Sequence, residues 1–339
     1  MIEVAVIGAG FQGANLARAL NAIDGARVSA IVGGGDQASR LASELETHVA
    51  TLADLAAAPP DFIVIAVPND LHAELATACL EIGSPLFVEK PVAIGRDAIS
   101  RLEKIAQDRT LLVGHSLRTT SGIRRLLDLV EEGAIGELRE VRGERVRLVL
   151  PGAAATWKTD PLRSGGEIYH EIHELDLMCL LGGRATEVFT LAEPRGMPDG
   201  IDRAVRRHSG LMFANGLIGI HDLSRVDHAA KWAFAVSGTE GAIIADFRRG
   251  LVERLEGGRA VESWPVFDIP SANDSLVSSS SGVVRYNRSG GATSEWMQRL
   301  SLNVAGEIVR VAKGGRSILE RAPFDAVDAA TRILEADAR

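Results

Sequence analysis

The chain has 339 residues, enough for two domains of roughly 100–200 residues each. Its 46% hydrophobic and 24% charged residues exclude a disordered chain. The net charge of −8 argues against nucleic acid or membrane as a partner, and two distant cysteines, Cys79 and Cys179, exclude a disulfide framework. Because no apolar run is long enough to cross a bilayer and Met1 leads directly into a strand-like run, we expect a soluble cytoplasmic protein without a targeting segment.

Residues 1–118 alternate short apolar runs with amphipathic segments. The expected strands are Ile2–Ile7, Arg27–Val32, Phe62–Val67, Leu86–Val88 and Leu111–Val113. The expected helices between them are Phe11–Ala22, Gln37–Thr47, Asp70–Ile82 and Asp97–Asp108. Strands that are apolar throughout and separated by helices are typical of a parallel sheet covered on both faces. With right-handed crossovers, this pattern predicts an α/β fold with a Rossmann-type doubly wound domain.

Residues 119–339 follow a different rhythm. A helix at Ile123–Glu132, a long strand at Leu138–Leu150 and a helix at Ile168–Leu181 precede a series of strands: Ala185–Leu191, Ser209–Phe213, Leu217–His221, Lys231–Ser237, Ala242–Asp246 and Leu251–Leu255. A Ser- and Gly-rich loop at Pro270–Thr293 and helices at Ser294–Val311 and Ala326–Ala336 complete the chain. This predicts an α+β domain with a large, mostly antiparallel sheet for substrate binding and oligomerisation. The final helices are candidates to pack back on the first domain.

A glycine-rich turn links the first strand to the first helix. It reads Gly8-Ala9-Gly10-Phe11-Gln12-Gly13, a GxGxxG pattern in the strand–helix context that dinucleotide binding requires. Gly8 permits the tight turn, Gly10 lets a pyrophosphate approach the backbone, and Gly13 allows the helix to pack closely on the strand. The anion would rest on the free N–H groups at the helix N-terminus. We therefore predict a bound NAD or NADP.

The end of the second strand does not distinguish NAD from NADP. An acidic residue there would bind the ribose hydroxyls of NAD. The strand instead runs into Gly33-Gly34-Gly35, with Asp36 as the nearest acid. Arg40, one turn later, is a candidate for a 2′-phosphate or simply an exposed helical arginine. Both residues are kept as candidate cofactor contacts.

Further motifs follow in an order that resembles one protein family over nearly the whole chain. They are Pro68-Asn69-x-x-His72, Glu89-Lys90-Pro91, Glu132-Gly133-x-x-Gly136, and Gly165-Gly166 ahead of His173-x-x-Asp176. With the glycine turn, they resemble the Gfo/Idh/MocA family of glucose–fructose oxidoreductases and inositol dehydrogenases. The resemblance implies NAD(P)-dependent hydride transfer, a catalytic Lys90, and a cofactor site that includes Phe11, Gln12, Val67, Pro68, Asn69, His72, Glu89 and Lys90.

The position of Lys90 in the predicted fold also favours a catalytic role on chemical grounds. It follows a strand at the carboxyl edge of the parallel sheet, where ligands of such folds bind. A partly desolvated lysine there can stabilise negative charge on a substrate oxygen or relay a proton. The alternative is a surface lysine before a loop proline. His72 is equally explained as a cofactor contact and as a residue that caps or packs its helix.

The segment Tyr169–Asp176 supplies the remaining catalytic candidates. On one continuous helix, Tyr169, His173 and Asp176 would share a side, because residues three and four apart lie on one face. The family resemblance implies that this helix faces the nicotinamide with an Asp-x-x-x-His pair; here His173 matches, but Tyr169 stands at the Asp position and Glu171 replaces a common glycine. We expect His173 to accept the hydroxyl proton and Tyr169 to orient the oxygen that Lys90 polarises.

The segment Tyr169–Asp176 also allows two other interpretations, and several loop residues are further candidates for the site. His170 and His173 are a possible zinc pair, but the pattern is HExH rather than HExxH, so no metal is predicted; a buried structural role for His173 is a further alternative. Arg118, Trp157, His170 and Asp176 are candidate substrate contacts. Lys158 and a lid formed by Arg285, Tyr286 and Arg288 are weaker ones, since each also suits a solvated loop.

The function predicted from these residues is reversible hydride transfer between a nicotinamide and a secondary hydroxyl or carbonyl of a sugar, cyclitol or related polyol. One alternative is a dinucleotide-binding sensor without catalysis. Another is an oxidoreductase acting on a non-sugar carbonyl or imine. We expect a small polyhydroxylated substrate as partner. Because one face of the second sheet would need covering, we also expect a homodimer or homotetramer.

Overall fold

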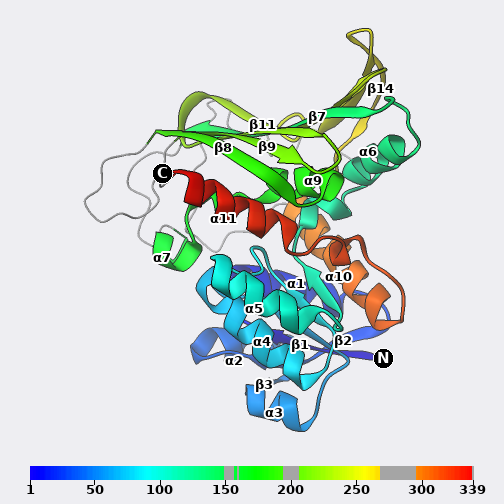
Figure 1. The fold of residues 1–339 in the computed structure, drawn as a ribbon. Helices are drawn as coiled ribbons and strands as arrows, with labels where there is room; N and C mark the ends of the chain where they lie inside the picture. Colours follow the sequence, from blue (N-terminus) through cyan, green and yellow to red (C-terminus); the bar gives the residue numbers. More distant parts are fainter. Residues whose placement is uncertain (149–155, 159, 194–205, 268–294, 338–339) are drawn as a thin grey trace.

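The computed structural model describes residues 1–339 except 149–155, 159, 194–205, 268–294 and 338–339. Two halves lie one above the other (Figure 1). The lower half holds a six-stranded parallel sheet and the upper half an eight-stranded, mostly antiparallel one. This is the α/β architecture that the alternating apolar runs predicted. Within the described residues, no helix is long and apolar enough to span a membrane.

The lower sheet has the strand order β3-β2-β1-β4-β5-β6, with every pair parallel. Its strands are β1 (Ile2–Ile7), β2 (Ala26–Val32), β3 (His48–Ala50), β4 (Phe62–Ile65), β5 (Leu86–Val88) and β6 (Leu111–Val113). Its helices are α1 (Phe11–Asn21), α2 (Gly35–Glu44), α3 (Leu52–Ala57), α4 (His72–Ile82) and α5 (Arg96–Ala106), with short 3-10 turns η1 (Asn69–Leu71) and η2 (Ser116–Thr119). Every residue of β4 and β5 is buried, as expected for strands covered on both faces.

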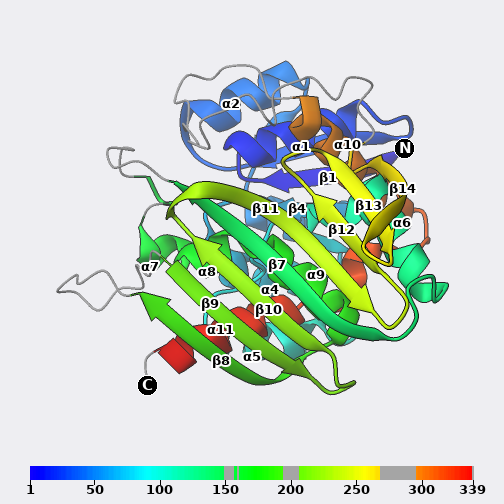
Figure 2. The ribbon, with the colours of Figure 1, turned by 90° about the horizontal axis from the view of Figure 1, so that it is seen from above.

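The upper sheet has the order β14-β13-β12-β11-β7-β10-β9-β8, and only the β7–β10 pair is parallel. The strands are β7 (Leu138–Leu148), β8 (Ala185–Glu193), β9 (Arg206–Phe213), β10 (Ile218–Ser224), β11 (Val226–Gly238), β12 (Ala242–Asp246), β13 (Leu251–Glu256) and β14 (Arg259–Pro265). Helices α6 (Ser121–Glu131), α9 (His173–Gly182) and α11 (Asp325–Asp337) lie under one face (Figures 1 and 2). The long β7 and β11 cross the middle of the sheet (Figure 2).

The last helices connect the halves. Helix α10 (Glu295–Ala312) packs on α1, where Val304 and Ile308 join the apolar cluster of Leu16 and Leu20. Helix α11 contacts β8 above and α5 below, and Arg96 on α5 pairs with Glu335 on α11. A further 3-10 turn, η3 (Ile318–Glu320), lies between these two helices. The final segment therefore returns to the first half of the molecule.

The helix predicted over Ile168–Leu181 is broken in two. Helix α8 (Glu167–His170) ends at Glu171, whose φ of −105° and ψ of 41° leave the helical region, and α9 begins at His173. A separate single turn, α7 (Pro161–Ser164), precedes Gly165-Gly166. The prediction of one continuous helix was wrong, and residues before and after the break do not share a face. The strand β3 and the helix α3 were also missed.

Candidate functional site

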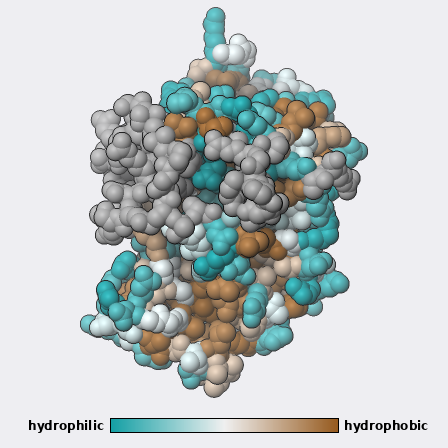
Figure 3. Space-filling model, turned by 90° about the vertical axis from the view of Figure 1, so that its left-hand side faces the viewer, coloured by the Kyte–Doolittle hydropathy of each residue, from teal (hydrophilic) through white to brown (hydrophobic). Residues whose placement is uncertain are grey.

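A cavity of about 910 Å³ lies where the carboxyl ends of β1, β2, β4 and β5 face β7 and β11 of the upper sheet. On the face shown in Figure 3, hydrophilic side chains gather between the two halves, above an apolar area on the lower half. The lining from the lower half includes Gly8, Gly10, Phe11, Gln12, Val67, Pro68, Asn69, His72, Glu89 and Lys90. The lining from the upper half includes Arg145, Arg147, Trp157, Lys158, His170, Glu171, His173 and Trp232. Ten of the predicted cofactor residues and four upper-half candidates (Trp157, Lys158, His170 and His173) thus lie around one cavity.

The glycine turn has the geometry of an anion cradle. Gly8 has a φ of +106°, and a Cβ there would lie 2.4 Å from the Ala66 carbonyl oxygen. A Cβ on Gly13 would lie 1.9 Å from the Gly8 carbonyl oxygen, so helix and strand approach too closely for a side chain. A Cβ on Gly10 would meet nothing within 4 Å, because this residue opens toward the cavity. The N-cap residue of α1 is Gly10, and no side chain among the described residues caps this helix. These residues fit a dinucleotide pyrophosphate.

The predicted ribose contacts Asp36 and Arg40 lie elsewhere. Their exposed side chains pair with each other at 3.2 Å on α2, and neither lines the cavity. Gln37, between them in sequence, does line it, together with Gly33 and Gly34. Asp36 and Arg40, four residues apart, pair with each other on the helix surface instead of contacting the cavity. No carboxylate among the described residues therefore lines the cavity at the end of β2.

Two buried side chains hold the loops around the cavity. The His72 ring nitrogens Nδ1 and Nε2 lie 2.6 and 2.9 Å from the carbonyl oxygens of Pro91 and Val67, so the ring spans both loops. Burial lowers the pKa of His72. Asn69 Nδ2 donates to the Ser164 carbonyl at 2.9 Å and ties the lower half to α7. The bond to Pro91 also fixes the segment that carries Lys90, which precedes Pro91 through a cis peptide bond.

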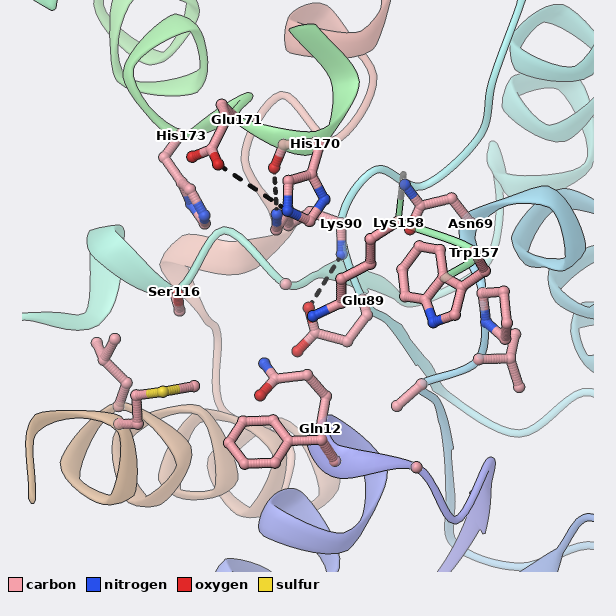
Figure 4. Close-up of a pocket in the computed structure, with 18 of the residues that line it drawn as sticks. Gln12, Asn69, Glu89, Lys90, Ser116, Trp157, Lys158, His170, Glu171 and His173 are labelled. Carbon is pink, nitrogen blue, oxygen red and sulfur yellow. Dashed lines mark hydrogen bonds and ion pairs between the residues drawn. The ribbon is translucent and has the colours of Figure 1, made fainter. Parts of the chain in front are cut away.

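The Lys90 side chain points across the cavity toward α8. Its Nζ donates to the His170 carbonyl at 2.6 Å (Figure 4). Burial lowers the pKa of the Lys90 ammonium, with further lowering by the cations of Lys158 and Arg145, while the carboxylates of Glu171 and Glu89 oppose the shift. The adjacent Glu89 has its pKa raised by burial. Lys90 forms no ion pair with any described carboxylate, so two of its three N–H donors remain for a ligand oxygen.

His173, the first residue of α9, faces the same space (Figure 4). Burial lowers its pKa well below the usual value, and the charges of Lys90 and Arg145 lower it further. The imidazole is therefore neutral near pH 7, and its Nδ1 has no hydrogen bond to a described residue. A neutral imidazole beside an ammonium can accept a proton from a hydroxyl that the ammonium polarises.

Tyr169 does not lie where the sequence predicted. It is 2% exposed, and its hydroxyl accepts from the Gly95 backbone N–H at 3.1 Å and bonds the Thr331 hydroxyl at 2.5 Å. It is absent from the cavity lining. The break at Glu171 turns Tyr169 away from His173 and Lys90. Tyr169 therefore joins α8 to α5 and α11, and the orienting role predicted for it does not fit this position.

Arg118 and Asp176 also do not line the cavity. They form a buried bidentate ion pair, with Nε and Nη2 of Arg118 donating to the two Asp176 carboxylate oxygens at 2.8 and 2.5 Å. Arg118 Nη1 further donates to the Ile318 carbonyl at 3.1 Å. Burial raises the pKa of Asp176, and the Arg118 charge opposes this. The pair joins α9 to η2 and η3, so the predicted substrate contacts are structural here.

Sequence reasoning missed a charged and aromatic cluster on the upper wall. Glu171 accepts from Arg145 Nε at 2.9 Å and pairs with Arg147 Nη2 at 2.5 Å. Burial opposes ionisation of Glu171, but these two guanidinium groups hold its pKa well below the usual range. Arg145 lies 3.9 Å above the ring of Trp232, which stacks on Phe247 at 4.9 Å. The sequence of β7 alone does not indicate this cluster, because the partners Glu171 and Trp232 come from other segments of the chain.

The remaining candidates divide in two. Trp157, Lys158 and His170 line the cavity, and burial with the nearby Lys90 charge lowers the pKa of His170 to about 3. Arg285, Tyr286 and Arg288 lie outside the described residues, as does the whole segment predicted as a loop at Pro270–Thr293. Among the residues that the structure describes, no group of three or more His, Cys, Asp or Glu side chains is placed to hold a metal ion.

Two family models match the chain. The oxidoreductase family model with an NAD-binding Rossmann fold matches residues 2–115, and the GFO/IDH/MocA C-terminal domain model matches residues 123–244. The chain belongs to the Gfo/Idh/MocA family. The family resemblance deduced from the motifs is thereby confirmed.

Relatives within this family differ in their named activities. An uncharacterized oxidoreductase of Streptococcus pneumoniae is 30% identical over 195 residues, 56% of this chain and 53% of that protein, so the match spans about half its length. The 2,7-anhydro-N-acetylneuraminate hydratase of Escherichia coli is 25% identical over 311 residues, 88% of this chain and 83% of that one. A levoglucosan dehydrogenase solved with NADH and levoglucosan shares the fold, with a TM-score of 0.79, 20% identity and coverage of 99% and 97% of the two chains.

Proposed function

We propose that this member of the family catalyses reversible hydride transfer between a nicotinamide and a secondary hydroxyl or carbonyl of a sugar, cyclitol or related polyol. The observation that carries the proposal is the convergence of Lys90 and His173 on the cavity that the glycine turn enters. Family membership supports the dinucleotide, and the names of several relatives support a polyhydroxylated substrate, among them a myo-inositol 2-dehydrogenase of Thermotoga maritima, 27% identical over 197 residues.

Each residue has a defined task in the oxidative direction. The backbone of Gly8–Gly13 and the N-terminus of α1 hold the pyrophosphate. Lys90 donates a hydrogen bond to the substrate oxygen and stabilises negative charge as it develops there. His173, held neutral by its burial, takes the hydroxyl proton. A bound nicotinamide would take up the hydride, and in reduction the same residues return the proton to the carbonyl oxygen.

The direct assay measures nicotinamide absorbance with NAD and NADP offered separately against sugars, inositols and sugar acids. Because two relatives are named hydratases, substrate loss is followed in parallel by NMR, which detects conversion without net reduction of the cofactor. Conversion of a polyol in either readout is the expected result. Dinucleotide binding with no conversion of any compound would contradict the proposal and favour a sensor on this fold.

We also propose that the chain forms a homodimer or homotetramer through the outer face of the upper sheet. Phe189 and Leu191 on β8 are 61% and 76% exposed, and Ile218 on β10 is 44% exposed. Exposed apolar side chains gathered on one sheet face favour a protein contact. Light scattering after gel filtration should give two or four times the 36.0 kDa chain mass, and a monomer would contradict the proposal.

A further inference from the structure

The catalytic cavity is lined by more basic than acidic side chains. Its described lining holds six Lys and Arg but only two carboxylates. The basic residues are Lys90, Arg145, Arg147, Lys158, Lys231 and Arg248, and the acidic ones are Glu89 and Glu171. The chain as a whole carries a net charge of −8, so this excess is local to the cavity. A cavity of one charge sign attracts ligands of the opposite sign.

Some of these cations are already paired. Arg147 pairs with Glu167 at 2.9 Å and with Glu171 at 2.5 Å. Lys231 pairs with Glu144 at 2.9 Å. Arg248 donates to the Ala230 carbonyl rather than to a carboxylate. Arg147 and Lys231 are therefore neutralised by carboxylates of the protein and contribute little net charge toward a ligand.

Arg145 and Lys158 retain donors that the described residues do not use. Arg145 bonds Glu171 through Nε alone, and its two terminal nitrogens have no hydrogen bond to a described residue. Trp232 below the guanidinium plane holds that plane in the cavity wall at 3.9 Å. Lys158 forms no ion pair with a described carboxylate, and its Nζ lies 5.7 Å from the ring centre of Trp157. Both cations are near enough to Lys90 to lower the pKa of its ammonium.

We propose that the substrate of the proposed reaction is an acid, whose carboxylate is bound by the free edge of the Arg145 guanidinium and by the Lys158 ammonium. This inference rests on the proposed function, because it places the carboxylate in the cavity that holds Lys90 and His173. A fixed guanidinium plane presents two parallel N–H donors, which match the two oxygens of a carboxylate. Lys158, which also lines the cavity, adds a second positive charge as a compact ammonium.

The phosphates of the dinucleotide do not account for these two cations. The glycine turn and the N-terminus of α1 supply the pyrophosphate site from the lower half. Arg145 belongs to β7 and Lys158 to the segment before α7, both in the upper half. In Figure 4, the side chains of Lys90 and Lys158 lie on one side of Glu89, and Gln12 of the glycine turn lies on its other side.

The test measures binding rather than turnover. Calorimetry with enzyme saturated with NADH compares two matched pairs of probes, D-galacturonate against D-galactose and L-tartrate against L-threitol. In at least one pair, the acid should bind about tenfold more tightly or better than its neutral partner, as one charge-assisted contact allows. Arg145→Gln and Lys158→Gln should each reduce this preference to about threefold or less without changing NADH affinity. Arg139→Gln and Lys104→Gln, two cations outside the cavity lining, should preserve it.

Several results would overturn the inference. These are equal binding of acid and neutral probe, no binding of either, an acid preference that survives both cavity variants, or a loss of NADH affinity in those variants instead. The outcome is separable from that of the proposed function. Acid-selective binding without hydride transfer to any probe would contradict the proposed function alone. Oxidation of neutral polyols without any acid preference would contradict only this inference.

Discussion

Glu174 is a buried carboxyl behind the cavity wall. It is the second residue of α9 and is 0% exposed. Its Oε1 accepts from the Trp232 indole N–H, while Oε2 has no hydrogen bond to a described residue. Burial raises the pKa of Glu174 from an ordinary 4.5 to about 7, even though the Arg145 charge opposes this. The folded protein therefore keeps a proton here that the unfolded chain releases.

This difference makes stability fall as pH rises. Between about pH 4.5 and about pH 7, unfolding releases the Glu174 proton, so the free energy of unfolding decreases with pH. At ~1.36 kcal/mol per pH unit, the loss amounts to ~3 kcal/mol once the pH exceeds both pKa values. Glu174→Gln copies the protonated form and keeps an acceptor for Trp232, so the variant should not suffer this loss.

Urea unfolding of both proteins between about pH 4.5 and about pH 8 measures the effect. The difference in free energy of unfolding, Gln variant minus wild type, should grow by ~3 kcal/mol over this interval. Glu132→Gln, which replaces an exposed carboxylate, is the matched control and should show no such growth. A Glu174→Gln difference that stays constant with pH would refute the assignment of a protonated, buried carboxyl.

Three further variants test the positions of individual residues. Gly10→Ala should fold with wild-type stability, because its Cβ meets nothing within 4 Å, yet weaken NADH binding at least tenfold in a fluorescence titration. Gly13→Ala should instead lower the melting temperature, because its Cβ would lie 1.9 Å from a carbonyl oxygen; equal melting temperatures for the two variants would contradict this geometry. Tyr169→Phe should lose about 1 kcal/mol of stability with kcat changed less than about threefold, and a large fall in kcat at unchanged stability would restore the orienting role.

The fold could be predicted because its signals are local. The apolar runs of β1, β4 and β5 and the glycines after β1 each fit within a few residues. The strand β3 was missed because it has three residues, two of them exposed, and so lacks an apolar run. The start of helix α3 does carry a local signal in the sequence, because Thr51 and Asp54 form a capping box. The prediction rested on runs of apolar residues and did not take this capping box into account.

The candidate site was predictable only where a motif coincides with a strand end or a helix start. Lys90 follows β5 and His173 begins α9, and both line the cavity. Tyr169 was misplaced because the prediction assumed one continuous helix. No feature of the local sequence indicates the break between α8 and α9. Its partner Thr331 lies 162 residues away, and the two residues of the Arg118–Asp176 pair are 58 residues apart. Spacing along the sequence does not contain such long-range pairings.

The ion pairs of the upper cavity wall could not be predicted for the same reason. Glu171 replaces a glycine common in the family, and from the sequence it was only a departure from the pattern. In the fold its carboxylate lies between Arg145 and Arg147, which come from a strand more than twenty residues earlier. Because Arg147 and Glu171 are both buried, removing either of these two partners leaves a buried charge unmatched.

The role of Lys90 is the central claim, and one paired measurement tests it most directly. Lys90→Met and the exposed control Lys313→Met are compared with wild type for NADH dissociation constant and for hydride-transfer rate in a single turnover with a substrate found by the absorbance and NMR assay. Lys90→Met should lower the rate at least about a hundredfold while NADH affinity stays within about threefold. An unchanged rate, or equal losses in rate and NADH affinity, would contradict a lysine that acts on the substrate oxygen.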